Sequence, residues 1–205
     1  MTEKYLLRLA RVMSKLFAPF YFCMLAFLVL FFFSYMRLLP WGYKLLILAI
    51  VYVFTIALPL LSIGVYKKLS GIHHHQMSKR ERRYVPYIIT IVSYTCCLIL
   101  MKNLHVPHFM TSTLIGALFI EIICALFNSR FRISTHAAAA GGMNGALLAF
   151  SFIFGFNPIW WLCLTVFIAG LVGSSRLILR QHTLKEVNWG TVVGFLGGFL
   201  SVLIF

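Results

Sequence analysis

The chain has 205 residues, of which 61% are hydrophobic and only 11% are charged, a balance typical of an integral membrane protein. There are four glutamates and no aspartate. Enzymes that hold magnesium on clustered carboxylates need several acids close together, so this scarcity argues against a metal-dependent phosphate enzyme, and we expect no cofactor. The formal net charge of +14 comes from basic residues beside apolar runs, which favours anionic lipid rather than nucleic acid as the partner.

The chain begins with a basic amphipathic segment. Residues 4–16 (KYLLRLARVMSKL) interleave leucines with lysines and arginines, which predicts a short interfacial helix. An apolar run from Phe17 to Met36 follows directly and is about as long as the ~20 residues that cross a bilayer. Because no small-residue cleavage site follows this run, we interpret it as a retained span.

Further apolar runs follow along the rest of the chain, separated by short connections that contain Pro, Gly, Asn or basic residues. The sequence therefore predicts an all-α, polytopic membrane helix bundle with about seven spans, or about six if one run is re-entrant. No internal repeat or linker divides the chain, so we treat residues 1–205 as a single membrane domain. The runs lie roughly at 45–66, 84–101, 109–127, 137–156, 158–179 and 190–205.

Seven crossings would place four polar segments on one side of the membrane: the N-terminus and residues 67–83, 128–136 and 180–189. Most of the lysines and arginines fall in or beside these segments. The positive-inside rule predicts that this side is cytoplasmic.

The segment GSSRLILRQHTLKEVNWG, residues 173–190, gathers several polar groups in this apolar chain. On a helix, His182 and Glu186 are at positions i and i+4 and can touch, and Ser175 shares a face with His182. A carboxylate beside an imidazole fixes its tautomer and supports the positive charge that develops if the ring attacks phosphorus. Arg176 offers planar donors suited to phosphate oxygens. Taken alone, the segment is equally consistent with a basic loop that contains an incidental histidine.

The segment Ser134-Thr135-His136 immediately precedes a run rich in Ala and Gly. If a helix begins there, its backbone N–H groups and its dipole favour an anion at that point. The alternative interpretation makes Ser134 a simple N-cap and His136 a solvated interfacial residue.

Together these residues resemble the type 2 phosphatidic acid phosphatase superfamily, over about residues 79–190. Ser-Arg followed by His and an acid resembles the third signature of this family, and Ser-Thr-His is similar to the second, usually Pro-Ser-Gly-His. The first signature, normally a lysine followed later by Arg-Pro, is approximate here. Lys79 and either Arg82 or Arg83 precede Pro86, but Val85 stands next to the proline.

The chain departs from the family pattern in two further places. Glu186 replaces the usual aspartate, which is a mild chemical change. Thr135 replaces a glycine, and this matters more because glycine lets the backbone approach a phosphate closely whereas a β-branched residue restricts that approach.

The resemblance implies metal-independent hydrolysis of a phosphate monoester or diphosphate on a membrane lipid through a phosphohistidine. His182 would attack phosphorus with Glu186 orienting it, and His136 would protonate the leaving alkoxide and then activate water. Substrates of this class are anionic phospholipids and polyprenyl phosphates or diphosphates. The residues expected to bind the phosphate are Lys79, Arg83 (with Arg82 nearly as good), Ser134, Thr135, Ser175 and Arg176.

Two other functions remain open at this stage. The altered signatures also fit a catalytically impaired protein of the same fold that binds or translocates lipid. Glu121, an acid within an apolar run, would be essential in an ion-coupled transporter, or else is a packing residue.

His73, His74 and His75 form a triplet with no acid or thiol beside it to complete a metal shell.

The sequence also leaves open on which side of the membrane the site lies. A multi-pass protein of the cell membrane is expected. The charge bias favours a cytoplasmic site, whereas resemblance to the bacterial membrane members of the family implies a site facing outward.

Overall fold

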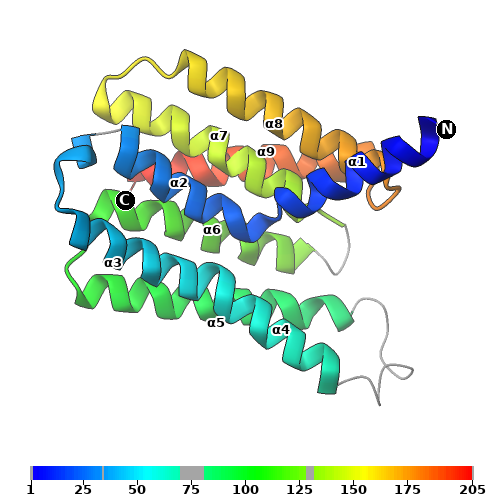
Figure 1. Ribbon diagram of the computed structural model, residues 1–205, viewed down its shortest axis with the longest axis horizontal. Helices are drawn as coiled ribbons and strands as arrows, with labels where there is room; N and C mark the ends of the chain where they lie inside the picture. The colour runs from blue at the N-terminus through cyan, green and yellow to red at the C-terminus, as the bar shows by residue number, and fades with distance from the viewer. Residues whose placement is uncertain (1, 34, 70–80, 128–131, 205) are drawn as a thin grey trace.

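The structure, a computed structural model, describes residues 2–33, 35–69, 81–127 and 132–204. Within these ranges the chain forms helices and no strand (Figure 1). In chain order they are α1 (Thr2–Leu16), α2 (Pro19–Phe33), the 3₁₀ turn η1 (Tyr35–Leu38), α3 (Trp41–Tyr52), the π-helical segment η2 (Val53–Ala57), α4 (Leu58–Leu69), α5 (Glu81–Asn103), α6 (His108–Phe127), α7 (Thr135–Phe154), α8 (Ile159–Ile178) and α9 (Leu184–Ile204).

Among the described residues, 6 helical stretches are long and apolar enough to cross a membrane. They match the predicted runs after the first to within a few residues, so the prediction of an all-helical, multi-pass membrane protein is confirmed. The stretches are Trp41–Tyr66, Tyr84–Asn103, His108–Phe127, Thr135–Phe154, Ile159–Ile178 and Leu184–Ile204.

The first predicted span, Phe17 to Met36, differs from the structure. α2 has only 15 residues and meets α1 at a bend of 59°, so the two helices make at most one broken seventh span. Pro19 explains the break, because proline lacks the N–H that would continue α1 and its ring disfavours a helical conformation at Ala18. The predicted amphipathic segment 4–16 is helical and lies within α1.

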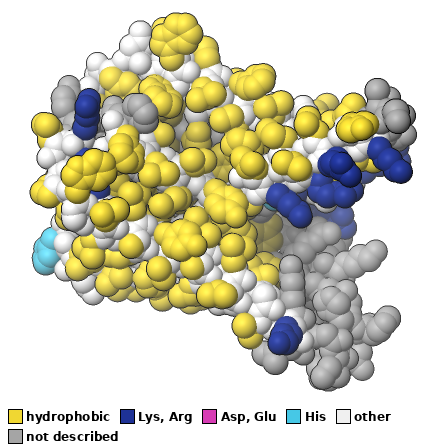
Figure 2. Space-filling view, in the orientation of Figure 1, with side chains coloured by type: hydrophobic (Ala, Val, Ile, Leu, Met, Phe, Trp, Pro, Cys, Tyr) yellow, Lys and Arg dark blue, Asp and Glu magenta, His cyan; other side chains and the backbone are white. Residues whose placement is uncertain are grey.

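The helix ends that border the polar segments lie at one end of the bundle (Figure 1). The N-terminus, the end of α4, the end of α8 and the starts of α5, α7 and α9 all lie there, and the C-terminus lies at the opposite end. In the face shown by Figure 2, basic side chains cluster over α1 at this end, while hydrophobic side chains cover most of the rest. This arrangement brings the start of α5, which carries Arg82 and Arg83, to the same end of the bundle as Ser134 and His182.

A row of glycines packs α9 closely against α7. Gly190, Gly194 and Gly198 recur every four residues, and each faces the α7 backbone. A Cβ on Gly194 would overlap the carbonyl oxygen of Ala138, and one on Gly198 would overlap that of Gly142. Small residues at this spacing let two membrane helices approach closely. The start of α9 is therefore held against the start of α7.

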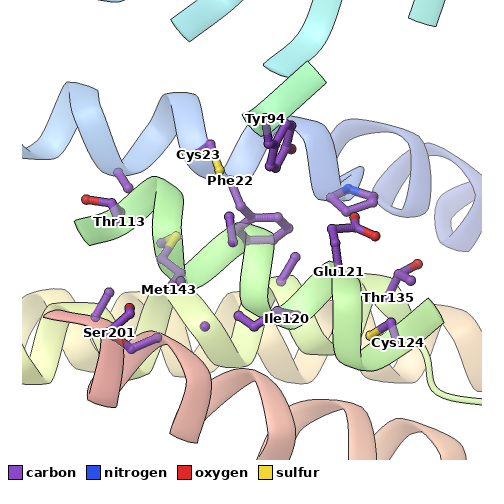
Figure 3. Close-up of a pocket in the computed structure, with 18 residues that line it drawn as sticks. Phe22, Cys23, Tyr94, Thr113, Ile120, Glu121, Cys124, Thr135, Met143 and Ser201 are labelled. Atoms are coloured by element: carbon purple, nitrogen blue, oxygen red, sulfur yellow. Dashed lines mark hydrogen bonds between the residues drawn. The ribbon is translucent and has the colours of Figure 1, made fainter. Parts of the chain in front are cut away.

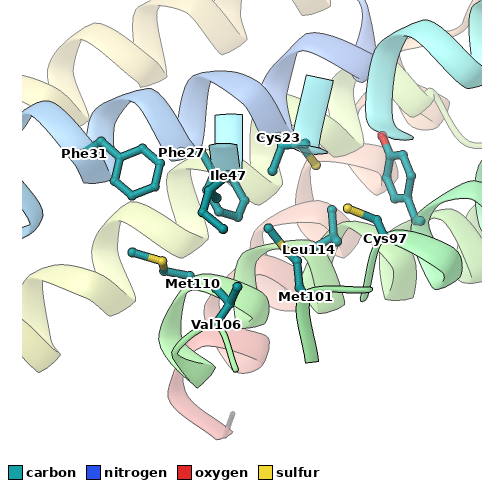
Figure 4. Packing of buried hydrophobic residues seen from close by; sticks show 11 residues of the cluster. Cys23, Phe27, Phe31, Ile47, Cys97, Met101, Val106, Met110 and Leu114 are labelled. Atoms are coloured by element: carbon teal, nitrogen blue, oxygen red, sulfur yellow. The ribbon is translucent and has the colours of Figure 1, made fainter. Parts of the chain in front are cut away.

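Apolar side chains from α2, α3, α5 and α6 form a buried core (Figure 4). Phe27 and Phe31 of α2 pack there with Ile47, Met101 and Met110, all of them fully buried. This core fixes α2, and therefore the bend at which α1 leaves it.

Candidate functional site

The turn between α8 and α9 carries His182. α8 ends at Ile178, and Arg180 then adopts a left-handed conformation with φ of 51° and donates its N–H to the carbonyl oxygen of Leu177 at 2.9 Å. This conformation stops the helix. His182 and Ser175 consequently do not share a helix, contrary to the helical arrangement considered from the sequence.

His182 nevertheless contacts Glu186 as expected. Its Nδ1 lies 2.9 Å from Oε2 of Glu186, and the two side chains are only 14% and 16% exposed. The same carboxylate oxygen accepts the N–H of Thr183 at 3.1 Å, while the Thr183 hydroxyl accepts the N–H of Glu186 at 3.4 Å. These reciprocal bonds form a capping box at the start of α9. Glu186 is thereby fixed, and with a proton on Nδ1 the His182 ring carries its lone pair on Nε2.

Ser134 connects this turn to the start of α7. It is the N-cap of α7, fully buried, and its Oγ accepts the N–H of Ala137 at 3.4 Å. Its own N–H donates to the backbone oxygen of Glu186 at 3.2 Å. The second and third signature segments are therefore joined by a backbone hydrogen bond, and Ser134 has the N-cap role that the sequence had left as an alternative.

His136 and Arg176 meet at a residue that the sequence did not single out. The Nε2–H of His136 donates to the backbone oxygen of Ser14 at 3.2 Å, and Nη1 of Arg176 donates to the hydroxyl of the same serine at 2.8 Å. Arg176 and His182 are both near enough to His136 for their charges to act on its ring. The sequence signal for Ser14 was weak: with Ala10 it forms a small-residue pair at positions i and i+4 in a helix of leucines and basic residues.

Two residues expected at the phosphate have other partners in the structure. Ser175 is buried and donates its hydroxyl to the carbonyl oxygen of Leu171 at 2.7 Å, within α8. Thr135 lines a small cavity of about 60 Å³ together with Glu121, Tyr94 and Ile120 (Figure 3). Glu121 thus faces a cavity that begins at the first residue of α7.

The residues of the first signature are only partly described by the structure. Lys79 and the triplet His73, His74 and His75 lie outside the described residues. Arg82 and Arg83 lie in the first turn of α5, which begins at the same end of the bundle as the other two signatures.

A larger apolar cavity of about 220 Å³ lies between α2, α7 and α8. Three of its residues, Ala26, Met143 and Ala146, also line the cavity of Thr135 and Glu121. Apolar cavities therefore follow α7 from its first residue to Phe154 near its far end.

The site can bind and attack an anion with side chains alone. It combines one imidazole oriented by a carboxylate, a second imidazole and a guanidinium. Among the residues that the structure describes, no group of three or more His, Cys, Asp or Glu side chains could hold a metal ion.

Searches of family models, curated proteins and solved structures found no match to this chain. Its function is therefore inferred from the residues of the site.

Proposed function

We propose that the protein is a lipid phosphatase of the type 2 phosphatidic acid phosphatase kind, which hydrolyses a phosphate monoester or diphosphate on a membrane lipid without a metal. One observation carries the proposal. The His182–Glu186 pair is bonded through the backbone to Ser134, which starts the helix that carries His136, and Arg176 lies close to His136. A nucleophile, an acid–base group and an anion-binding cation thus come from separate segments to one end of the bundle.

The first chemical step requires a neutral His182 and a protonated His136. The Nε2 lone pair of His182 attacks phosphorus while Glu186 stabilises the positive charge that develops on the ring. The bond between phosphorus and the lipid oxygen breaks, and His136 gives its proton to the leaving alkoxide. Arg176 binds the phosphoryl oxygens, where negative charge must be stabilised in the transition state.

The second step restores the enzyme. His136, now neutral with a free lone pair, takes a proton from water, and the resulting hydroxide attacks the phosphohistidine. The bond between phosphorus and Nε2 of His182 breaks, inorganic phosphate leaves, and both histidines return to their starting states.

A lipid substrate is supported by the cavities beside the site. The walls of the larger cavity are almost entirely apolar, with Leu25, Val29, Met143 and Phe150 among its residues. Such a surface suits a hydrocarbon chain better than a polar molecule. A cell-membrane location belongs to the same proposal, with the charge bias favouring a cytoplasmic site.

The test is phosphate release by the purified full-length protein from a panel of phosphatidate, phosphatidylglycerol phosphate, polyprenyl diphosphate and lipid A phosphate. His182→Ala is expected to abolish release and to remove the acid-labile phosphoenzyme that wild type accumulates. His108→Ala, which changes an exposed histidine at the opposite end of the bundle, is the matched control. Full activity in His182→Ala would refute the proposal.

The second candidate function is a lipid-binding or lipid-translocating protein that has lost catalysis. It is favoured by the contacts of Ser14, which already occupy His136 and Arg176. Such a protein binds phosphatidate without turnover. Turnover that is lost in both His136→Ala and His182→Ala would exclude it.

A further inference from the structure

The C-terminal turn of α1 contacts His136 and Arg176, the acid–base and phosphate-binding residues of the proposed function. Ser14 offers two oxygens there, its backbone oxygen to His136 and its hydroxyl to Arg176. The end of a helix also carries partial negative charge from its unpaired carbonyl groups. α1 therefore presents to these two residues the same features as a phosphate: two acceptor oxygens and negative charge.

The contacts of Ser14 leave the site only partly satisfied. Nε of Arg176 and Nδ1 of His136 are both buried and have no hydrogen-bond partner among the residues that the structure describes. A buried donor without a partner is costly, so Nε of Arg176 points to an absent acceptor, whereas Nδ1 of His136, with the ring proton on Nε2, is itself an acceptor. A phosphate carries more oxygens than Ser14 supplies, and its charge makes each hydrogen bond from Arg176 stronger than one to a neutral hydroxyl.

In this position His136 is unable to perform the chemistry proposed for it. Its Nε2–H points at the Ser14 carbonyl oxygen, and its Nδ1 is buried. A leaving alkoxide or an incoming water reaches the ring only after Ser14 moves away.

α1 is attached in a way that permits this movement. Among residues 4–16, whose side chains the structure describes, only Ala10 and Ser14 are buried, and both are small. The break at Phe17 and Ala18, where α1 meets α2 at 59°, provides a hinge. α2 itself is anchored in the apolar core by Phe27 and Phe31.

The two exposed faces of α1 suit a membrane surface. One face carries the basic row Lys4, Arg8, Arg11 and Lys15, and the next carries the apolar row Tyr5, Leu9, Val12 and Leu16. A helix with such faces lies favourably at the boundary between headgroups and hydrocarbon. α1 can therefore leave the site without exposing an apolar face to water.

We propose that α1 is a lid over the site, held shut by Ser14 and opened when the phosphate group of a phosphomonoester takes Arg176 and His136 from it. This inference rests on the proposed function, because it treats these two residues as the groups that handle phosphate. It adds a step before catalysis, in which Ser14 competes with the substrate.

Lid opening is measured by thiol labelling of full-length Ser14→Cys in neutral detergent, with the rate at each cysteine read by mass spectrometry. Inorganic phosphate is expected to raise the labelling rate at position 14 by about threefold or more, because it shifts the lid from mostly closed to mostly open. Phosphatidate in the micelles has the same effect if the lipid headgroup is also accepted, while phosphatidylcholine has none. Cys163 of α8, which is exposed and far from the site, is the internal reference. Slower labelling with phosphate, or no change in the labelling rate, would refute the proposal that α1 is a lid.

The activity test uses Ser14→Ala, which removes the hydroxyl that binds Arg176. Its kcat/KM is expected to rise about two- to tenfold, since one hydrogen bond no longer holds the lid shut. Ser14→Thr keeps the hydroxyl and should resemble wild type. Ser151→Ala removes a buried serine near the far end of α7 and is the control for lost packing. Reduced activity in Ser14→Ala, with wild-type activity in Ser14→Thr, would mean that Ser14 positions Arg176 and would overturn the lid.

The two failures are distinguishable. If phosphate release does not depend on His182, the proposed function is refuted. Labelling at position 14 still reports whether phosphate moves α1 away from the site. If release depends on His182 but neither Ser14 test responds as expected, the proposal that α1 is a lid is refuted, and the proposal that the protein is a phosphatase is not affected.

Discussion

Replacing Glu186 by glutamine tests the role of its charge with little change in shape. In the structure one carboxylate oxygen accepts hydrogen bonds from His182 and from the N–H of Thr183, at 2.9 and 3.1 Å. The glutamine oxygen can still accept both, so the capping box survives, and the expected loss of folding stability is below about 1 kcal/mol. The charge that supports the His182 ring is lost.

The effect on catalysis is larger because the His182 ring becomes positive as it attacks phosphorus. A hydrogen bond to a charged group contributes about 1.5–3 kcal/mol against about 1 kcal/mol for a neutral one. The pair is mostly shielded from water, so this difference is little weakened by solvent. We expect kcat to fall by about two- to thirtyfold, which corresponds to this difference of ~0.5–2 kcal/mol in transition-state stabilisation.

The assay is rapid-quench measurement of phosphoenzyme formation and phosphate release with the purified protein. Glu186→Asp, which keeps the charge and matches the family's usual residue, should retain most of the activity. A kcat for Glu186→Gln within twofold of wild type would refute this account, as would a fall in kcat that the loss of folded protein explains completely.

Three further predictions concern packing, the second signature and sidedness. Gly194→Leu should destabilise the protein by more than about 2 kcal/mol in detergent unfolding, because its side chain would overlap the Ala138 carbonyl, whereas Gly42→Leu, with open space around it, should unfold like wild type. Thr135→Gly should raise kcat/KM by about two- to tenfold, since glycine lets the start of α7 approach the phosphate more closely; unchanged or lower kcat/KM would show that Thr135 does not restrict this approach. A cysteine introduced at exposed Gln181 should resist an impermeant thiol reagent in intact cells and react after permeabilisation, and labelling of intact cells would place the site on the outside.

Much of the bundle could be predicted from the sequence because a membrane span needs little more than a long apolar run. The boundaries of the stretches from Trp41 onward follow this rule. The helix observed in the first predicted span begins later than predicted, because Phe17 and Ala18 precede Pro19, where backbone chemistry, not hydropathy, decides that a helix breaks. Hydropathy alone treats Phe17 to Met36 as one uniform run.

The site was partly predictable. The contact between His182 and Glu186 follows from spacing, and the Thr-x-x-Glu pattern at Thr183 also indicates a capping box at the start of α9. The left-handed conformation of Arg180 could not be predicted from the sequence, because arginine has no special preference for it. Ser14 could not be predicted to meet Arg176, since their contact depends on how α1 folds back onto α8.

The glycine row that joins α9 to α7 also bears on how the protein is assembled. Of the 6 candidate spans, α7 has the lowest mean hydropathy, 1.5, and the largest buried share, 67%. It depends on α9 to cover its glycines and its start, yet α9 is synthesised only after α8. During biosynthesis α7 therefore waits in the membrane without its closest partner, and His136 and His182 come together only when α9 docks. Mutations in this row should consequently lower the yield of inserted protein in cells more than they lower the stability of molecules that have already assembled.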